Sequence, residues 1–259
     1  MKRKFPDLST SLLCIGLDSD FAKIPKRFYD EQFPQFEFNK WIIDQTHEYV
    51  SAYKPNLAFY EAQGMQGWHE LKLTLDYLEE KHPDIFTIAD AKRADIGSTN
   101  EGYVSAIFDR FGFDAVTLNP YLGGEALRPF LDRTDKTCII LCKTSNPGSG
   151  EFQDLSVGKK NESLWQVVAE RVAKKWNKAG NCMLVVGATY PKELAVVRKI
   201  VGEMTILVPG VGTQGGDLQA VLTHGLTKNG QGLLINVGRS VIFAQDPRAE
   251  IADLASQLS

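Results

Sequence analysis

The sequence is poor in the residues that bind transition metals or form disulfides. It has four cysteines and four histidines in 259 residues, without CxxC, HExxH or other paired spacing. The cysteines all lie in apolar segments, so we predict buried, reduced thiols at Cys14, Cys138, Cys142 and Cys182. We expect surface or packing roles for His47, His69, His82 and His224. The sequence therefore predicts no bound metal, and it excludes a disulfide-stabilised miniprotein.

Long hydrophobic runs and an excess of charge of one sign are also missing. The basic start MKRKF is followed by PDLST, and the apolar run from Leu12 ends at Asp18, so we expect neither an export signal nor a membrane span. The net charge of −3, from 29 basic and 32 acidic residues, gives no broad positive field for nucleic acid or an anionic membrane. We therefore predict a cytoplasmic protein in which local cations bind any anionic substrate.

The composition that remains, with 43% hydrophobic and 24% charged residues, is that of a globular protein with a sizeable core. Short apolar, β-branched segments recur along the chain without strict alternation, as expected for parallel strands covered on both faces. We predict eight strands, within 12–18, 53–60, 86–92, 115–121, 138–145, 183–189, 205–212 and 232–238. Segments with helical spacing lie between them, for example at 38–49 and 68–78.

This repeated strand and helix pattern fits a doubly wound open sheet or a closed (β/α)₈ TIM barrel. The even spacing of the strands and the lack of a Pro/Ser-rich linker favour the barrel, which usually has about 250 residues. We predict an α/β fold with a single barrel domain over residues 1–259, its last helix near 249–258. Two loops are long, at 19–37 and 146–161. The second is glycine-rich and polar, which suits a mobile lid or a plain surface excursion.

The residues at the carboxyl ends of these strands are unusually polar. They are Asp18, Lys54, Asp90, Lys92, Asn119, Ser145 and Arg239. Each of them alone also fits a solvated loop. In a barrel, however, the carboxyl ends of the strands meet at one mouth, where active sites lie. The pattern therefore predicts a polar site at that mouth.

The densest group of polar residues is the segment DAKRADIGST, which starts at Asp90. Asp90 and Lys92 are two apart on a strand, so both side chains are expected on the same face. Buried charges are costly unless they are paired. With Asp95 and Lys54, the segment predicts two carboxylates and two ammonium groups that nearly neutralise each other, as catalytic groups or as a structural ion-pair network.

A second group comprises PGVGTQGGD and, after the next strand, NVGRS. Gly210, Gly212 and Gly215 match the G-x-G-x-x-G of dinucleotide sites, but the match follows the seventh strand and no acidic residue ends the eighth. Loops after strands seven and eight of a barrel commonly bind phosphate through backbone N–H groups, and Arg239 adds a cation beside them. The pattern favours a phosphate monoester over a dinucleotide.

Together these motifs resemble the orotidine 5′-monophosphate decarboxylase family over nearly the whole chain. The similarity lies in GLD at Gly16, YKPN around Lys54, D-x-K-x-x-D at Asp90, NPY at Asn119, SNPG at Ser145, PGVGTQGGD and NVGRS. D-x-K-x-x-D alone also resembles sugar-phosphate decarboxylases and aldolases, so the combination with the two phosphate loops is the specific feature. The long first loop is similar to the longer-chain branch of the family.

The resemblance implies a role for each site residue. Lys54, Asp90, Lys92 and Asp95 would form an alternating catalytic tetrad, with Asp95 reaching into the site of the neighbouring subunit of a homodimer. The substrate would be bound by Asp18, Thr99, Asn119, Ser145, Gln214, Gly238 and Arg239. Asp18 and Lys54 would meet the ribose, and Asp95 and Thr99 of the partner subunit would meet its hydroxyls. Ser145 would bond the pyrimidine, and Gln214 with Arg239 would contact the base and phosphate. Shorter members carry Glu-Met-Ser where this chain has Lys-Thr-Ser before Asn146.

The resemblance also implies the reaction, which is cofactor-independent decarboxylation of orotidine 5′-monophosphate in pyrimidine biosynthesis, with Lys92 as proton donor to C6. Two alternatives stay open. A sugar-phosphate decarboxylase or aldolase on the same scaffold would need Mg²⁺ held by carboxylates. A phosphate-ligand sensor would bind uridine 5′-monophosphate without turnover.

Overall fold

In the computed structural model, which describes residues 5–212 and 215–258, eight parallel strands close into a barrel. Their order around the barrel is β1-β10-β9-β8-β5-β4-β3-β2. The strands are β1 (Leu13–Leu17), β2 (Ala52–Pro55), β3 (Phe86–Arg93), β4 (Ala115–Leu118), β5 (Thr137–Lys143), β8 (Cys182–Val186), β9 (Ile206–Pro209) and β10 (Leu233–Val237). All eight predicted strands are confirmed, and the closed barrel replaces the open sheet as the architecture.

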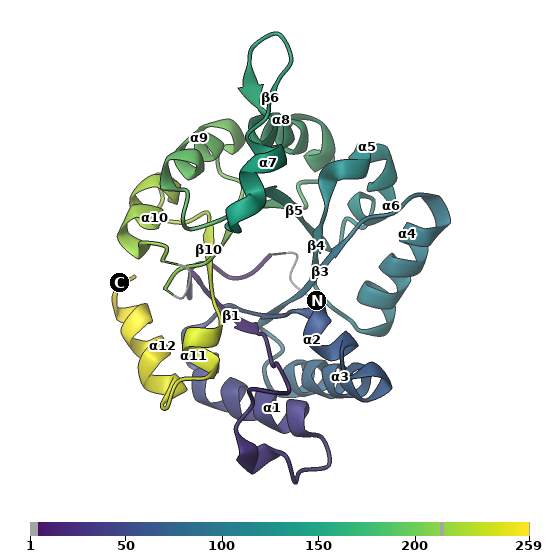
Figure 1. The fold of residues 1–259 in the computed structure, drawn as a ribbon, viewed down its shortest axis with the longest axis vertical. Helices are drawn as coiled ribbons and strands as arrows, with labels where there is room; N and C mark the ends of the chain where they lie inside the picture. The colour runs from purple at the N-terminus through teal and green to yellow at the C-terminus, as the bar shows by residue number, and fades with distance from the viewer. Residues whose placement is uncertain (1–4, 213–214, 259) are drawn as a thin grey trace.

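Helices surround the barrel on its outer side (Figure 1). They are α1 (Pro34–Thr46), α2 (Leu57–Glu61), α3 (Gly64–Lys81), α4 (Gly97–Val104), α5 (Gly123–Ala126), α6 (Arg128–Leu131), α7 (Gly150–Gln153), α8 (Leu164–Arg171), α9 (Pro191–Val201), α10 (Leu218–Gly225), α11 (Arg239–Ile242) and α12 (Pro247–Ser256). The starts of several helices follow ordinary capping chemistry. Proline opens α1, α9 and α12, and the Asp217 carboxylate accepts hydrogen bonds from the N–H groups of Gln219 and Ala220.

The barrel strands are buried on both faces, which explains their continuous apolar sequences. On β1, Leu13 and Ile15 pack in the larger core cluster with the helices, whereas Cys14 belongs to a second cluster. The second cluster also contains Ile88 and Met183 from β3 and β8, and it fills the inside of the barrel. The two clusters therefore correspond to the two faces of one closed sheet. All four cysteines are buried, as predicted.

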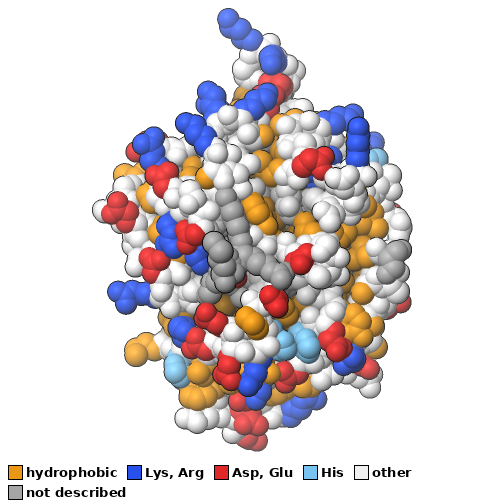
Figure 2. All heavy atoms as spheres, turned by 180° about the vertical axis from the view of Figure 1, so that it is seen from behind, with side chains coloured by type: hydrophobic (Ala, Val, Ile, Leu, Met, Phe, Trp, Pro, Cys, Tyr) orange, Lys and Arg blue, Asp and Glu red, His pale blue; other side chains and the backbone are white. Residues whose placement is uncertain are grey.

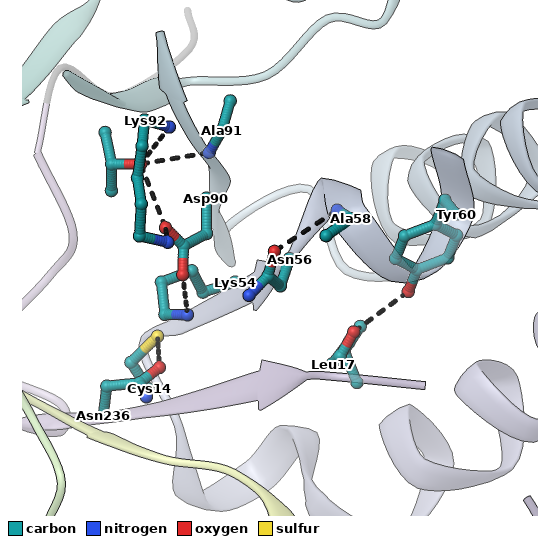
Figure 3. A network of polar contacts seen from close by, with 11 residues as sticks. Cys14, Leu17, Lys54, Asn56, Ala58, Tyr60, Asp90, Ala91, Lys92 and Asn236 are labelled. Carbon is teal, nitrogen blue, oxygen red and sulfur yellow. Dashed lines mark hydrogen bonds and ion pairs between the residues drawn. The ribbon is translucent and has the colours of Figure 1, made fainter. Parts of the chain in front are cut away.

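A polar network fixes the long loop after β1. The Gln35 side chain donates to the carbonyl of Ser19 at 2.7 Å, and Asn39 donates to the hydroxyl of Tyr60 at 3.0 Å. Tyr60 in turn donates to the carbonyl of Leu17, the last residue of β1, at 3.2 Å (Figure 3). These contacts hold the end of β1 against α1 and α2, and so they position the residue that follows, Asp18.

Two predicted segments differ from the structure. The apolar run 53–60 was expected as one strand, but β2 ends at Pro55 because Asn56 caps α2 by accepting from the N–H of Ala58. The long polar loop 146–161 contains α7, and β6 (Ser156–Val157) within it pairs with β7 (Glu162–Ser163) in an antiparallel hairpin. This hairpin projects away from the barrel in Figure 1. Closure of the loop as a lid stays a prediction.

Basic and acidic side chains are interspersed over the face shown in Figure 2. Within residues 5–212 and 215–258, no helix is long and apolar enough to cross a membrane.

Candidate active site

A cavity of about 430 Å³ lies at the carboxyl ends of the barrel strands. Seven of the predicted site residues line it: Asp18, Lys54, Asp90, Lys92, Ser145, Gly238 and Arg239. They come from both ends of the sequence and from five of the eight strand ends, those of β1, β2, β3, β5 and β10. The barrel thus brings most of the predicted residues together at one mouth, as the strand-end argument requires.

The centre of the cavity is an ion array formed by one carboxylate and two ammonium groups. Nζ of Lys54 lies 2.8 Å from Oδ2 of Asp90, and Nζ of Lys92 lies 2.6 Å from Oδ1. Figure 3 shows Asp90 between the two lysines. The side chains of Lys54 and Asp90 are 6% and 11% exposed, whereas that of Lys92 is 48% exposed. Lys92 is therefore the member of the array that a ligand in the cavity can reach.

Lys92 reaches this position through a distortion of β3. The pairing of β3 with β4 shifts register between Ala89 and Arg93, and Lys92 has a φ of +48°. This left-handed conformation is uncommon for a residue other than glycine. The prediction that Asp90 and Lys92 face the same way is confirmed, because both line the cavity while Ala91 between them packs in the larger core cluster. An irregular strand end, which alternation does not describe, brings the two side chains together.

The environment keeps Asp90 and Lys54 of the array ionised. Burial alone would raise the pKa of Asp90, but the ammonium groups of Lys54 and Lys92 outweigh it and hold that pKa well below its usual range. Burial alone would lower the pKa of Lys54, but the carboxylates of Asp90 and Asp18 raise it above its usual value. Burial raises the pKa of the neighbouring Cys14 thiol to about 12. Cys14 is thus a neutral packing group and not a nucleophile at neutral pH.

Asp18 carries an unsatisfied oxygen at the edge of the cavity. Its Oδ1 atom is buried and has no hydrogen-bond partner in the described part of the chain. Gly16 and Gly238 flank this carboxylate, since a Cβ on either would lie 3.4 Å or 3.7 Å from one of its oxygens. A buried carboxylate oxygen without a donor is costly. The oxygen therefore fits a ligand that brings a donor, such as a hydroxyl group.

The segment after β5 forms one wall of the cavity and contains Ser145. The Gln153 side chain accepts from the N–H of Thr144 at 2.9 Å and donates to the hydroxyl of Thr144 at 2.8 Å. Gly187 lies against Ser145, and a Cβ there would come within 2.9 Å of its backbone. The fully buried Lys143 pairs with Asp154 at 2.7 Å. These contacts hold both ends of the segment 144–154 against the barrel.

The opposite wall is rich in glycine and contains the cation Arg239. Gly210 and Gly212 have φ values of 100° and 78°, a region that side chains other than glycine rarely adopt. Arg239 is exposed to the cavity, and it has no ion-pair partner within the described ranges. Glycines leave the backbone N–H groups uncovered by side chains, and such groups together with an unpaired guanidinium suit an anionic ligand. The predicted contact residue Gln214 lies outside the described residues.

Three predicted site residues do not line this cavity. Asp95 accepts a hydrogen bond from the N–H of Ile96 at 2.7 Å, and Thr99 is exposed on α4. The Asn119 side chain accepts from the N–H of Tyr121 at 3.1 Å and so caps the turn after β4. The residues that line the cavity therefore do not include Asp95, Thr99 or Asn119.

Sequence reasoning missed several polar residues of the cavity: Asn56, Thr117, Thr144, Asn146, Gln153 and Asn236. Thr117 had a usable signal, because it lies two residues before Asn119 at a strand end. Gln153 had none, because it reaches the cavity only through the fold of the segment after β5. Within the described residues, no three His, Cys, Asp or Glu side chains form a group that could hold a metal ion. The absence of a cofactor stays a prediction.

The fold and the cavity define the chain as a (β/α)₈-barrel protein with a charged pocket where barrel enzymes carry their active sites. Residues 11–254 match the model of the orotidine 5′-phosphate decarboxylase / HUMPS family. The chain therefore belongs to this family.

Individual relatives give the same result. An orotidine 5′-phosphate decarboxylase of Christiangramia forsetii is 51% identical over 244 residues, which are 93% of this chain and 88% of that protein. One of Cellvibrio japonicus is 45% identical over 260 residues, or 97% and 94% of the two chains.

Solved structures agree with the sequence comparison. The Leishmania donovani OMP decarboxylase has a TM-score of 0.86 and 41% identity, over 96% of this chain and 93% of that chain. The Leishmania donovani UMP synthase has a TM-score of 0.88 and 42% identity over 96% of this chain. This chain spans 53% of the UMP synthase.

Proposed function

We propose that this chain decarboxylates orotidine 5′-monophosphate (OMP) to uridine 5′-monophosphate (UMP) without a cofactor, as a step of pyrimidine nucleotide synthesis. The observation that carries the proposal is the Lys54–Asp90–Lys92 array in the barrel cavity of a member of this family. A purely structural ion pair would not need a half-exposed ammonium group facing an open cavity.

The charges of the cavity fit this substrate. Lys54, Lys92 and Arg239 give three positive charges, and Asp18 and Asp90 give two negative ones, so one positive charge remains. OMP carries a carboxylate on its ring and a phosphate on its ribose. The two kinds of anion match two sets of cations from different strand ends, the lysines of the array on β2 and β3 and Arg239 after β10.

The array supplies the chemistry of the reaction. The bond between C6 and the carboxylate carbon breaks, CO₂ leaves, and the electron pair stays at C6 in the plane of the ring. The π system cannot delocalise this charge, so electrostatic stabilisation is needed. The Lys92 ammonium group stabilises the developing charge and then donates a proton to C6, and solvent later returns the proton to the lysine. Asp90 holds Lys92 in place and lies close to the departing carboxylate.

The remaining residues bind the parts of the nucleotide that do not react. The Oδ1 atom of Asp18, which lacks a partner in the described chain, accepts a hydrogen bond from a ribose hydroxyl. Ser145 forms a hydrogen bond with the edge of the pyrimidine. Arg239 and the backbone at Gly238 bind the phosphate, with Gln214 and Asn119 as further contacts inherited from the family motifs. Closure of the segment after β5 over the base would remove water from the array and use the phosphate binding energy for catalysis.

We further propose a homodimer in which Asp95 and Thr99 complete the site of the partner subunit. Large apolar side chains are exposed in the segment that contains Asp95 and in the segment after β4, with Ile96, Tyr121 and Leu122 63%, 81% and 49% exposed. The segment that contains Asp95 and Thr99 lies beside the segment after β4, because the Asn100 side chain of α4 donates to the carbonyl of Ala126 in α5. Exposed apolar groups beside a carboxylate that does not line the cavity of its own chain are typical of a surface that a second copy covers.

The direct test follows the absorbance of OMP as purified protein converts it to UMP. We expect turnover, and we expect EDTA to leave the rate unchanged. Turnover of a sugar phosphate that EDTA abolishes and Mg²⁺ restores would support the sugar-phosphate alternative instead. Tight binding of UMP without any turnover of OMP would indicate a sensor.

Replacement of Arg239 by alanine tests the phosphate contact. We expect kcat/KM for OMP to fall by about two orders of magnitude, the equivalent of about 3 kcal/mol for a charge-assisted contact. The decisive comparison uses orotidine, which lacks the phosphate. An equal loss with orotidine would show that Arg239 does not bind phosphate. Arg248→Ala is the matched control, because Arg248 pairs with Glu48 at 2.6 Å on the outer surface.

A further inference from the structure

Thr117 of β4 lies directly beside the ion array, and its hydroxyl group is fully used. The residue is 1% exposed. Its Oγ1 atom accepts hydrogen bonds from the N–H groups of Ala91 at 3.0 Å and Lys92 at 2.9 Å, and it donates to Oδ1 of Asp90 at 3.0 Å. A hydroxyl group has one donor and two acceptor sites. All three therefore serve three consecutive residues of β3.

These hydrogen bonds explain the irregular end of β3. Two successive N–H groups can converge on one oxygen only where the strand leaves its regular pleat, and Lys92 does so with its φ of +48°. The register of β3 against β4 shifts at the same place. Because the strand bends toward Thr117, Nζ of Lys92 comes back to within 2.6 Å of Oδ1 of Asp90.

The same oxygen of Asp90 accepts from both Thr117 and Lys92. Its other oxygen accepts from Lys54. The Asp90 carboxylate is thereby held from three sides by β2, β3 and β4. A rotation of this carboxylate would move the proton donor, since Lys92 is paired with it.

We propose that Thr117 is a positioning residue for the reaction, acting through the backbone of Lys92 and the carboxylate of Asp90. This inference rests on the proposed function of the array. Thr117 does not need to touch the substrate, and its effect is to set the distance and direction of the Lys92 ammonium group relative to C6. Misplacement of a reacting group by about 1 Å lowers rates about 100-fold.

The test compares Thr117→Val with Thr117→Ser. Valine keeps the shape but removes the hydroxyl, whereas serine keeps the hydroxyl. We expect Thr117→Val to lower kcat about 100-fold while the Kd of UMP changes less than about threefold, because phosphate, ribose and base contacts are untouched. We expect Thr117→Ser to retain kcat within about threefold.

The matched control is Thr87→Val at the other end of β3. Thr87 also donates to a carboxylate, that of Asp114 at 2.9 Å, and it accepts from the N–H of Asp114. Its replacement removes comparable hydrogen bonds from the barrel, far from the array, and so reports the cost to stability alone. We expect a lower melting temperature for both valine variants but a loss of kcat only for Thr117→Val.

The outcomes separate the inference from the proposed function. An inactive wild-type chain would refute the proposed function and the inference with it. Active wild type together with a Thr117→Val variant within threefold of its kcat, or a Thr117→Ser variant as slow as valine, would refute the inference alone. If Thr117→Val does not fold, Thr117→Cys replaces it. Cysteine is close in size to serine, but its thiol is a weak hydrogen-bond donor and acceptor. A cysteine variant as active as serine would then overturn the inference.

Discussion

Replacing Lys92 by alanine is expected to lower kcat/KM for OMP by about four orders of magnitude or more. Two contributions are lost together. General acid catalysis by a positioned group contributes about 10²–10⁴-fold, and one electrostatic contact to the transition state contributes about 10²–10³-fold. No other ammonium group of the described cavity can take over, because Lys54 is buried and bound to the far oxygen of Asp90.

The measurement is kcat/KM from the absorbance of OMP, with UMP binding by calorimetry as a test of folding. UMP should still bind, because its phosphate and ribose contacts remain. Lys23→Ala is the control, since Lys23 forms an exposed ion pair with Asp20 at 2.8 Å outside the cavity. A Lys92→Ala enzyme within tenfold of wild type would exclude Lys92 as the proton donor.

The barrel was predictable because its signal is repeated along the whole chain. Eight buried strands separated by helical segments leave few other architectures, and each strand is apolar on both faces. Element ends were less predictable. The run from Tyr53 continues as apolar residues into α2, and only the capping contact of Asn56 with Ala58 ends the strand at Pro55.

The candidate site was predictable where one rule sufficed. Residues that follow strands in a barrel meet at its mouth, and Asp18, Lys54 and Asp90 do so. Alternation correctly placed Asp90 and Lys92 on one face, but it did not predict the irregular strand end that Thr117 supports from the neighbouring strand. Such a contact depends on strand pairing in three dimensions, which the spacing of residues along one segment does not contain.

Sharing of the site between subunits is the remaining part of the proposal, and it gives the second large effect. Asp95 lies three residues after Lys92, beyond β3, and does not line the cavity of its own subunit. In the proposed dimer each site uses Lys92 from one chain and Asp95 from the other. Lys92→Ala and Asp95→Ala should each inactivate a homodimer, because each homodimer carries the lesion in both of its sites.

A mixture of the two variants should recover activity. In a heterodimer one site collects both lesions, while the other has the native Lys92 and the native Asp95. Half of randomly formed dimers are heterodimers, and one of the two sites in each heterodimer is native. About one quarter of all sites in the mixture should therefore be native. Differently tagged chains are refolded together, and the heterodimer, in which half of the sites should be native, is purified and assayed. Lys92→Ala mixed with Asp90→Ala is the matched control, because both residues belong to the same chain in every site and no native site can form. Recovery in the first mixture and none in the second would establish the shared site. Heterodimers as inactive as either parent would place Asp95 in the site of its own subunit.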